Sequence, residues 1–309
     1  MGNHMKKVLL LAVAALTAHA SSFYLTIAGA PGEPDYEPRF NGWVSDFNKS
    51  ISAEAGAKVD SLVGKDASKA NIQAKLASIA TQAKADDTFV LLLIGHGSYD
   101  NIDYKFNLVG VDISATELAS ALDKIAARQL IVDATSASGG AIEKLQKDKR
   151  IVITATKNGT ERNATTFARY WVEAFRDPAA DTDKNQTLTA LEAYRYARTK
   201  TKDYFDAQKR LATEHSMLED TGKKNGENDP SVANGQGMLA TRFPLMHLGS
   251  SATALADPAK QAALKRKDEL ETAVDELKYK KSALDQPTYD KQMRQLLLEL
   301  AKVQATLDQ

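Results

Sequence analysis

The sequence predicts an α/β domain in which a mostly parallel, doubly wound sheet is flanked by helices. The strongest evidence is two apolar runs, residues 86–100 (DDTFVLLLIGHGSYD) and 128–140 (RQLIVDATSASGG), which stop abruptly at small and polar residues. Such runs are typical of buried parallel strands. Helical spacings alternate with them along the chain, which favours the doubly wound class.

The first part of the chain alternates strand and helix patterns. Residues 23–28 (FYLTIA) predict a buried strand, and the Gly- and Pro-rich residues 29–38 predict a turn segment at its end. A helix is expected over about 40–54, a short strand over 58–63, and an amphipathic helix over 69–84. The order strand, helix, strand, helix is that of an α/β domain.

The same alternation continues further along. Ser114, with Glu117 three residues later, forms a capping-box pattern that marks the start of a helix. The apolar residues 151–156 (IVITAT) predict another parallel strand. Later elements are expected as helices over 164–175 and 193–211 and a last strand over 243–248.

The composition changes near the C-terminus. From residue 257 onward Lys, Glu, Ala, Leu and Gln dominate with helical spacing, interrupted at 285–287. Two antiparallel helices joined by a short turn are therefore expected. We divide the chain into an α/β domain over 21–250 and a helical hairpin over 251–309, which packs on its own domain or forms a homodimer or partner contact.

The N-terminal residues 1–20 resemble a signal peptide. Lys6 and Lys7 precede the apolar run 8–16, and Ala18 and Ala20 flank a single residue as in a small-x-small cleavage site. The run is too short to span a bilayer. We interpret residues 1–4 as a tag remnant and expect export, to the periplasm or as a secreted protein; the alternative is a buried first strand or helix.

Charge and cysteine content exclude several functions. Forty basic and forty acidic residues give no net positive field, so nucleic acid is not an expected partner. The chain has no cysteine. Disulfides, thiolate metal sites and a thiol nucleophile are therefore all excluded.

Two polar segments follow the two central strands. His96 lies between glycines in Gly95-His96-Gly97, and Ser136 lies in the hydroxyl-rich run 135–140. Ligands of open α/β sheets bind beyond the carboxyl ends of the strands, so both side chains should face one crevice as base and nucleophile. The main-chain amides of Gly97 and Ser136 could hold a developing oxyanion. Alternatively, His96 is only a loop residue.

These motifs, in this order, resemble the caspase-like cysteine peptidases, and in particular the legumain branch. In that branch one strand ends in His-Gly, and about forty residues later another ends in a small residue, a cysteine nucleophile, any residue and Ser-Gly. Aligning Ser138-Gly139 on that pattern puts Ser136 at the cysteine position. The resemblance implies a caspase-like fold and a peptide or protein substrate.

The resemblance also assigns roles to residues elsewhere in the chain. Asp35, followed by Tyr36, matches the polar position that orients the catalytic histidine; alternatively it is a turn-forming aspartate. Arg39 corresponds to a substrate-reading arginine, although in the family that residue directly follows the tyrosine. Thr156 and Glu161 correspond to the lining of the specificity pocket; alternatively, Glu161 caps a helix. His215 cannot be assigned a role.

Three functions fit this pattern. The first is a pseudo-enzyme, or a Cys-to-Ser variant, that binds peptides but turns them over slowly or not at all, because a hydroxyl is a much weaker acid than a thiol. The second is an active serine-type peptidase (hydrolase) that uses Ser136, His96 and Asp35. The third is a non-catalytic interaction module built on the hairpin and a calcium loop.

That calcium loop is predicted by a twelve-residue match to the EF-hand pattern, residues 181–192. Oxygen-bearing side chains occupy its positions 1, 3, 5, 7 and 12, whereas Gln186 replaces the glycine usual at position 6. The expected cofactor is a structural Ca²⁺ ion; the alternative is an acidic loop that caps the following helix. The expected ligands are Asp181, Asp183, Asn185, Thr187 and Glu192.

Overall fold

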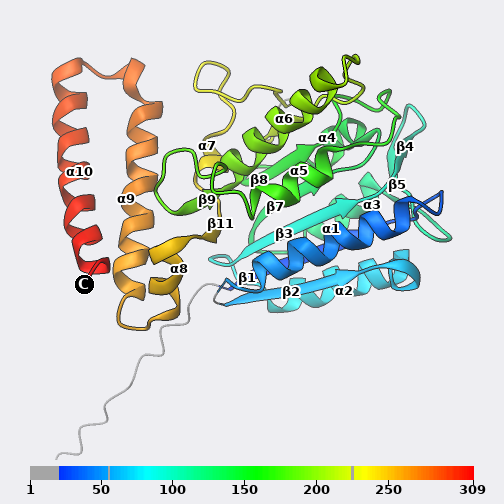
Figure 1. The fold of residues 1–309 in the computed structure, drawn as a ribbon, viewed down its shortest axis with the longest axis horizontal. Coiled ribbons are helices and arrows are strands. Elements are labelled where there is room, and N and C mark those ends of the chain that lie inside the picture. Colours follow the sequence, from blue (N-terminus) through cyan, green and yellow to red (C-terminus); the bar gives the residue numbers. More distant parts are fainter. Residues whose placement is uncertain (1–20, 55, 224–225) are drawn as a thin grey trace, which may run out of the picture.

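The computed structural model describes residues 21–54, 56–223 and 226–309 (Figure 1). The predicted signal peptide, residues 1–20, lies outside the described residues. Within the described part of the chain, no helix combines the length and the apolar character needed to cross a membrane.

The centre of the molecule is a mixed sheet whose strands run in the order β10-β8-β7-β3-β1-β2, counted over the described residues. All neighbouring pairs are parallel except β10 with β8. The order grows outward in both directions from the first strands, so the sheet is doubly wound as predicted. Its strands are β1 (Ser22–Ala28), β2 (Ala57–Leu62), β3 (Thr88–Ile94), β7 (Arg128–Asp133), β8 (Arg150–Thr154) and β10 (Met217–Glu219).

Helices cover both faces of this sheet. One face carries α1, α5 and α6, whose apolar side chains pack with those of the central strands. The opposite face carries α2, α3 and α4. The bounds are α1 (Tyr36–Ile51), α2 (Lys69–Gln82), α3 (Ala115–Leu122), α4 (Ile142–Leu145), α5 (Phe167–Ala174) and α6 (Ala190–Ala207).

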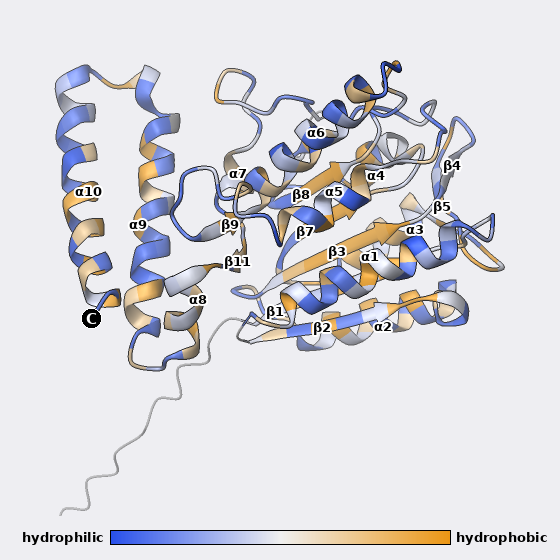
Figure 2. Cartoon of the chain, viewed as in Figure 1, coloured by the Kyte–Doolittle hydropathy of each residue, from blue (hydrophilic) through white to orange (hydrophobic). Residues whose placement is uncertain are grey.

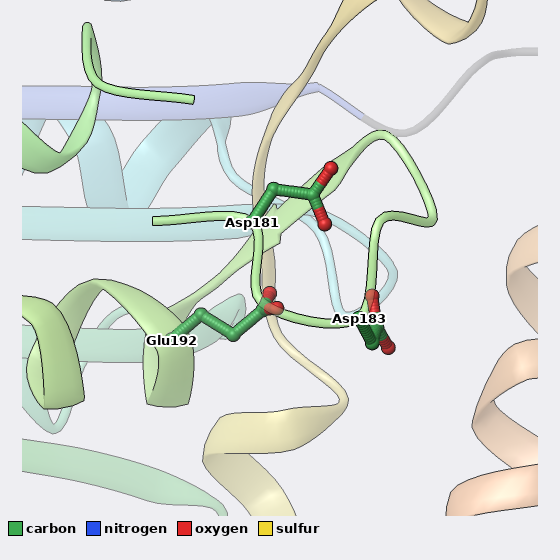
Figure 3. A group of neighbouring side chains, drawn as sticks. All are labelled: Asp181, Asp183 and Glu192. Carbon is green, nitrogen blue, oxygen red and sulfur yellow. The ribbon is translucent and has the colours of Figure 1, made fainter. Parts of the chain in front are cut away.

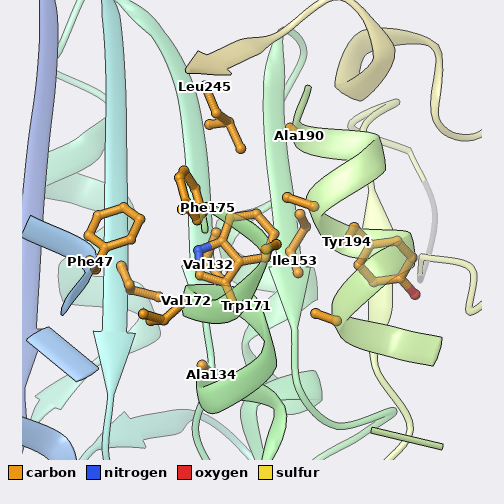
Figure 4. Close-up of a cluster of buried hydrophobic side chains, with 14 of the residues drawn as sticks. Phe47, Val132, Ala134, Ile153, Trp171, Val172, Phe175, Ala190, Tyr194 and Leu245 are labelled. Carbon is orange, nitrogen blue, oxygen red and sulfur yellow. The ribbon is translucent and has the colours of Figure 1, made fainter. Parts of the chain in front are cut away.

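Burial on both faces explains why the middle residues of the central strands are apolar. Every residue of β3 and β8 is buried, and Figure 2 shows the central strands as hydrophobic. On the α1 side, Phe47 packs edge-on against Phe175, and Trp171 fills the space above Val132 and Ile153 (Figure 4). Removing any of these rings would leave a cavity costing about 3–5 kcal/mol.

Shorter strands form two small sheets beside the central one. The strand expected over 243–248 is present as β11 (Pro244–His247), but it pairs with β9 (Thr187–Thr189) outside the central sheet. The short strand β10 takes the edge position instead. A third sheet joins β4 (Gly97–Tyr99), β5 (Tyr104–Phe106) and β6 (Ile113–Ser114).

The C-terminal helical hairpin is present as predicted. It consists of α9 (Gln261–Tyr279) and α10 (Gln286–Leu307), which lie side by side at one end of the molecule (Figure 1). Pro287 lies in the first turn of α10, where its missing N–H is not needed. A short helix, α8 (Gly249–Ala256), crosses the predicted boundary at residue 250 and leads from β11 into the hairpin. Helix α7 (Met238–Thr241) lies before β11.

Candidate active site

His96 follows the carboxyl end of β3 and is half-buried between aromatic rings. The ring of Tyr36 is 4.8 Å away and that of Phe40 is 5.5 Å away, both edge-on. The imidazole Nε2 lies 3.1 Å from the main-chain oxygen of Pro31. Because a carbonyl only accepts hydrogen bonds, this contact requires a proton on Nε2 and leaves Nδ1 as the basic nitrogen of the neutral ring.

The surroundings of His96 favour its neutral form. Burial lowers the pKa of the imidazole below its usual 6.5, while the Pro31 carbonyl and the charge of Glu33 act in the opposite direction. The ring is therefore available as a proton acceptor at neutral pH. A base of this kind is what nucleophilic catalysis requires.

Ser136 follows the carboxyl end of the neighbouring strand β7 and is 2% exposed. Its Oγ accepts a hydrogen bond from the amide of Gly97 and donates one to the Gly97 carbonyl, each 3.1 Å long. Ala137, the next residue, has a left-handed backbone (φ 57°) that reverses the chain directly after the serine. The two segments predicted to share a crevice are thus in direct contact.

The hydroxyl of Ser136 is directed at the main chain and not at the base. Among the hydrogen bonds of the described residues, none joins Ser136 to the His96 ring. The contact with the Gly97 amide holds Oγ at one of the two N–H groups predicted to stabilise an oxyanion. The amide of Ala137 is directed elsewhere, since it donates to the carbonyl of Glu161 over 2.7 Å.

A buried polar network that the sequence did not reveal supports the Ser136 turn. Asp133 is fully buried at the end of β7, and its Oδ1 accepts hydrogen bonds from Tyr104 (3.1 Å) and Thr135 (2.7 Å). The hydroxyls of Tyr104 and Thr135 are themselves 2.6 Å apart. Burial raises the pKa of Asp133 to about 7, and the hydroxyl donors moderate that rise. The network fixes the residue immediately before the nucleophile position.

Among the hydrogen bonds of the described residues, none joins Asp35 to His96. It is exposed at the N-terminus of α1, and its side chain makes no capping hydrogen bond. The Pro31 carbonyl, four residues earlier, contacts the imidazole nitrogen instead. Arg39 is exposed on the same helix, with its guanidinium 5.1 Å from the centre of the Tyr36 ring and 5.5 Å from that of Trp43. The Tyr36 ring therefore contacts both the Arg39 guanidinium and the His96 ring.

Glu161 forms a close contact with His215, the histidine that sequence patterns could not assign. A carboxylate oxygen of Glu161 lies 2.5 Å from Nδ1 of His215, and the other accepts the main-chain amides of Lys157 (2.8 Å) and His215 (3.1 Å). His215 comes from the segment before β10, 54 residues away in sequence. Glu161 is therefore linked to the Ser136 turn through its carbonyl and to His215 through its side chain.

Thr156 lies beneath the site and not on its surface. It is fully buried, and its hydroxyl accepts the Gly139 amide at 2.9 Å. Ser138 Oγ accepts the amides of Ala155 and Thr156. These contacts join the turn after β7 to the end of β8. Thr156 therefore holds this turn in position.

The predicted calcium loop lies far from His96 and Ser136 in sequence, at the start of α6. Three of its carboxylates, those of Asp181, Asp183 and Glu192, each have an oxygen within 4.8 Å of the others (Figure 3). Glu192 also completes a capping box with Thr189, which was the alternative interpretation. The structure thus contains the helix cap and a cluster of three carboxylates in the same loop.

The structure is an α/β protein in which His96 and Ser136 follow the carboxyl ends of the neighbouring parallel strands β3 and β7. The sequence pattern of the Peptidase C13 family matches residues 43–229, more than half of the chain. The chain belongs to the Peptidase C13 family. The resemblance to legumain-type peptidases is thereby confirmed at the level of the family.

Solved structures show weaker similarity. A protein from Geobacter sulfurreducens, GSU0716, shares 13% identity with a TM-score of 0.48, over 74% of this chain and 100% of that one. The Drosophila initiator caspase Dronc shares 10% identity with a TM-score of 0.43, over 67% and 81%. Caspase-1 from Spodoptera frugiperda shares 12% with a TM-score of 0.46, over 65% and 87%. No curated protein sequence matches the chain significantly.

Proposed function

We propose that this protein is a peptide-binding member of the Peptidase C13 family whose peptidase turnover is slow or absent, because Ser136 occupies the position of the nucleophilic cysteine. The observation that carries the proposal is the contact of Ser136 Oγ with the Gly97 amide at 3.1 Å. It supports Ser136, among the neighbouring hydroxyls, as the residue at the nucleophile position. Thr135 and Ser138 are hydrogen-bonded into the protein interior.

The chemistry of the hydroxyl argues for slow turnover. A cysteine peptidase depends on a thiolate formed beside an imidazole, and a serine hydroxyl is far harder to deprotonate. Ser136 also donates its proton to the Gly97 carbonyl, so the resting hydroxyl is not activated by His96. Serine triads add a carboxylate that stabilises the imidazolium, whereas the His96 ring meets a neutral carbonyl. These observations disfavour the serine-type alternative.

Groups suited to binding a peptide surround the site. The exposed guanidinium of Arg39 offers a fixed cation near His96, since the rings of Tyr36 and Trp43 support it. Glu161 and His215 offer an acidic and an imidazole group, and the Glu161 carbonyl accepts the amide of Ala137, next to Ser136. A substrate with a carboxylate and an amide side chain would find complementary partners in Arg39 and in the Glu161–His215 pair.

One observation favours an additional role as an interaction module. On α10, Leu297 is 49% exposed and Leu298 is 58% exposed, an unusual placement for two adjacent leucines. A second copy of the chain, or another partner, would cover this part of the hairpin. Sedimentation of wild type and a Leu298→Glu variant tests this role, because loss of a dimer in the variant alone is expected.

Restoring the thiol tests the proposed site directly. Ser136→Cys should react with iodoacetamide at pH 6 at least about tenfold faster than Ser120→Cys, an exposed control thiol on α3 whose pKa should be near 8.5. Adding His96→Ala to Ser136→Cys should abolish the difference. The Ser136→Cys protein should also cleave fluorogenic peptides after Asn or another polar residue, whereas the unmodified protein should not.

Two results would contradict the proposal. If the unmodified protein cleaves peptides and Ser136→Ala abolishes the cleavage, the protein is a serine-type peptidase. If Ser136→Cys reacts no faster than Ser120→Cys and cleaves nothing, Ser136 is not at a nucleophile position.

A further inference from the structure

We propose that residues 181–192 form a binding site for a calcium ion, independent of the role of Ser136. The loop precedes α6 and includes the strand β9. Carboxylate oxygens of Asp181, Asp183 and Glu192 come within 4.8 Å of one another, although their like charges repel. Figure 3 shows Asp181 and Asp183 on the loop and Glu192 on the first turn of the helix α6. A divalent cation held by oxygen atoms would remove the repulsion.

Two buried polar atoms provide a second, separate indication of a ligand. Asp181 is 6% exposed, and its Oδ1 has no hydrogen-bond partner among the described residues. Thr187 is 4% exposed, and its Oγ1 is likewise without a partner in the described part of the chain. A buried polar atom without a partner costs about 1–3 kcal/mol. A bound cation would satisfy Asp181 Oδ1, and a water on that cation would satisfy Thr187.

The capping role of Glu192 does not compete with metal binding. One of its oxygens accepts the amide (2.9 Å) and the hydroxyl (3.0 Å) of Thr182, and the other accepts the amide (3.0 Å) and the hydroxyl (2.9 Å) of Thr189. These donors use both lone pairs of each oxygen, so a cation would displace the two hydroxyls, which can rotate away, while the two amide contacts stay. The capping contacts instead hold Glu192 in place as the last ligand of the loop.

The backbone at position 6 has the conformation that the calcium loop requires. Gln186 adopts φ 68°, a left-handed conformation usual for glycine. Its side-chain oxygen accepts hydrogen bonds from Ser250 Oγ at 2.6 Å and from the Ser251 amide at 3.1 Å. These contacts from α8 stabilise a strained residue, which explains how the loop tolerates the loss of glycine.

The loop opens on a cavity of about 330 Å³ between α6, the segment 230–244 and α9. Helix α9 lines the cavity with Asp268, Glu271 and Asp275, which add negative charge facing Asp183. Lys278 and Arg195 lie at the same cavity. A cation could enter the loop from this cavity and keep some of its bound water. Such a site suits the flexible coordination of calcium better than the strict octahedral coordination of magnesium.

Calorimetry of the chelator-treated full-length protein tests the site with CaCl₂ as the probe. We expect one ion per chain with a Kd of about 10 μM to 1 mM, and a rise in melting temperature. Asp183→Asn should weaken binding at least about tenfold, because it removes one charged ligand that is exposed and makes hydrogen bonds only within the loop. Asp203→Asn, at an exposed position of α6, is the matched control and should bind as wild type does.

Three outcomes would overturn the proposal. The first is no heat and no melting shift at 10 mM CaCl₂, a concentration about tenfold above the weakest expected Kd. The second is an equal loss of affinity in Asp183→Asn and Asp203→Asn. The third is an equal response to MgCl₂, which would indicate general screening of acidic charge.

Discussion

The hydroxyl of Ser136 and the main chain of Gly97 are joined by two hydrogen bonds, one in each direction and each 3.1 Å long. The residue that follows His96 is thus held against Ser136. This contact requires a close approach of two backbones, which explains the glycine at position 97. A β-carbon there would lie 2.5 Å from the Ser136 carbonyl oxygen and also against the Tyr104 ring.

The first prediction follows from this close approach. Gly97→Ala should lower the free energy of unfolding by about 1–3 kcal/mol, because the backbones must separate to make room. Gly42→Ala is the control: this exposed position inside α1 has no neighbouring atom within 4 Å of an added β-carbon. It should raise stability by about 0.5–1 kcal/mol through helix propensity. Urea denaturation measures both, and an equal effect of the two changes would contradict the close approach.

The second prediction concerns the partner of His96. Because the ring nitrogen meets the Pro31 carbonyl, Asp35→Asn should leave the pKa of His96 unchanged and below 6.5. Glu33→Gln should lower it further, since Glu33 is the carboxylate whose charge favours the imidazolium. Titration of the imidazole by NMR measures both effects and also reports which nitrogen carries the proton. A drop of a full pKa unit in Asp35→Asn alone would restore Asp35 as the orienting residue.

The fold could be predicted from the sequence where long segments are buried, because burial determines which of their residues are apolar. The strands β3, β7 and β8 are covered on both faces, so their central residues are apolar and polar residues follow or end them. The strand β10 is three residues long and pairs antiparallel at the edge, which is too short to show a period. Its edge position was therefore missed, although the neighbouring strands were predicted.

The sequence indicated candidate site residues only where the side-chain type itself suggests chemistry. His96 and Ser136 were predicted because a histidine and a hydroxyl follow the two central strands. The contact of His96 with Pro31 uses a main-chain oxygen. Every residue has such an oxygen, so the sequence does not indicate this contact. The contact between Tyr104 and Asp133 joins residues 29 positions apart, and folding alone brings them together.

The third prediction is a loss of stability at high pH caused by His247. Burial disfavours the charged ring, but hydrogen bonds with Asp268 and Glu54 outweigh burial and raise its pKa to about 9. The folded state therefore holds the proton more tightly than the unfolded state. This contribution, on the order of 2–3 kcal/mol, is fully present below about pH 6.5 and is lost as the pH rises through about 9.

Urea denaturation at pH 6, 8 and 10 measures the effect of His247. Wild type should be clearly more stable than His247→Gln at pH 6, and the difference should shrink by pH 10. A difference that stays constant across these values would show that His247 acts through packing and not through its charge.

The last prediction concerns Lys267, which attaches the hairpin to the α/β domain. This lysine of α9 is 3% exposed, and its ammonium donates to the Asn185 carbonyl, to Ser251 Oγ (3.2 Å) and to the Glu271 carboxylate (3.3 Å). Lys267→Met would leave these acceptors buried without their donor. Breaking a buried ion pair in this way costs about 3–5 kcal/mol.

Because two of the three lost contacts join α9 to other parts of the protein, at Asn185 and Ser251, the cost should appear first as detachment of the hairpin and not as global unfolding. Chymotrypsin should cleave Lys267→Met between residues 249 and 285 much faster than wild type. Lys265→Met, at an exposed position of the same helix, should digest as wild type does. Equal digestion of all three proteins would show that the apolar contacts of α9, from Leu264, Leu270 and Val274, hold the hairpin without the buried ammonium.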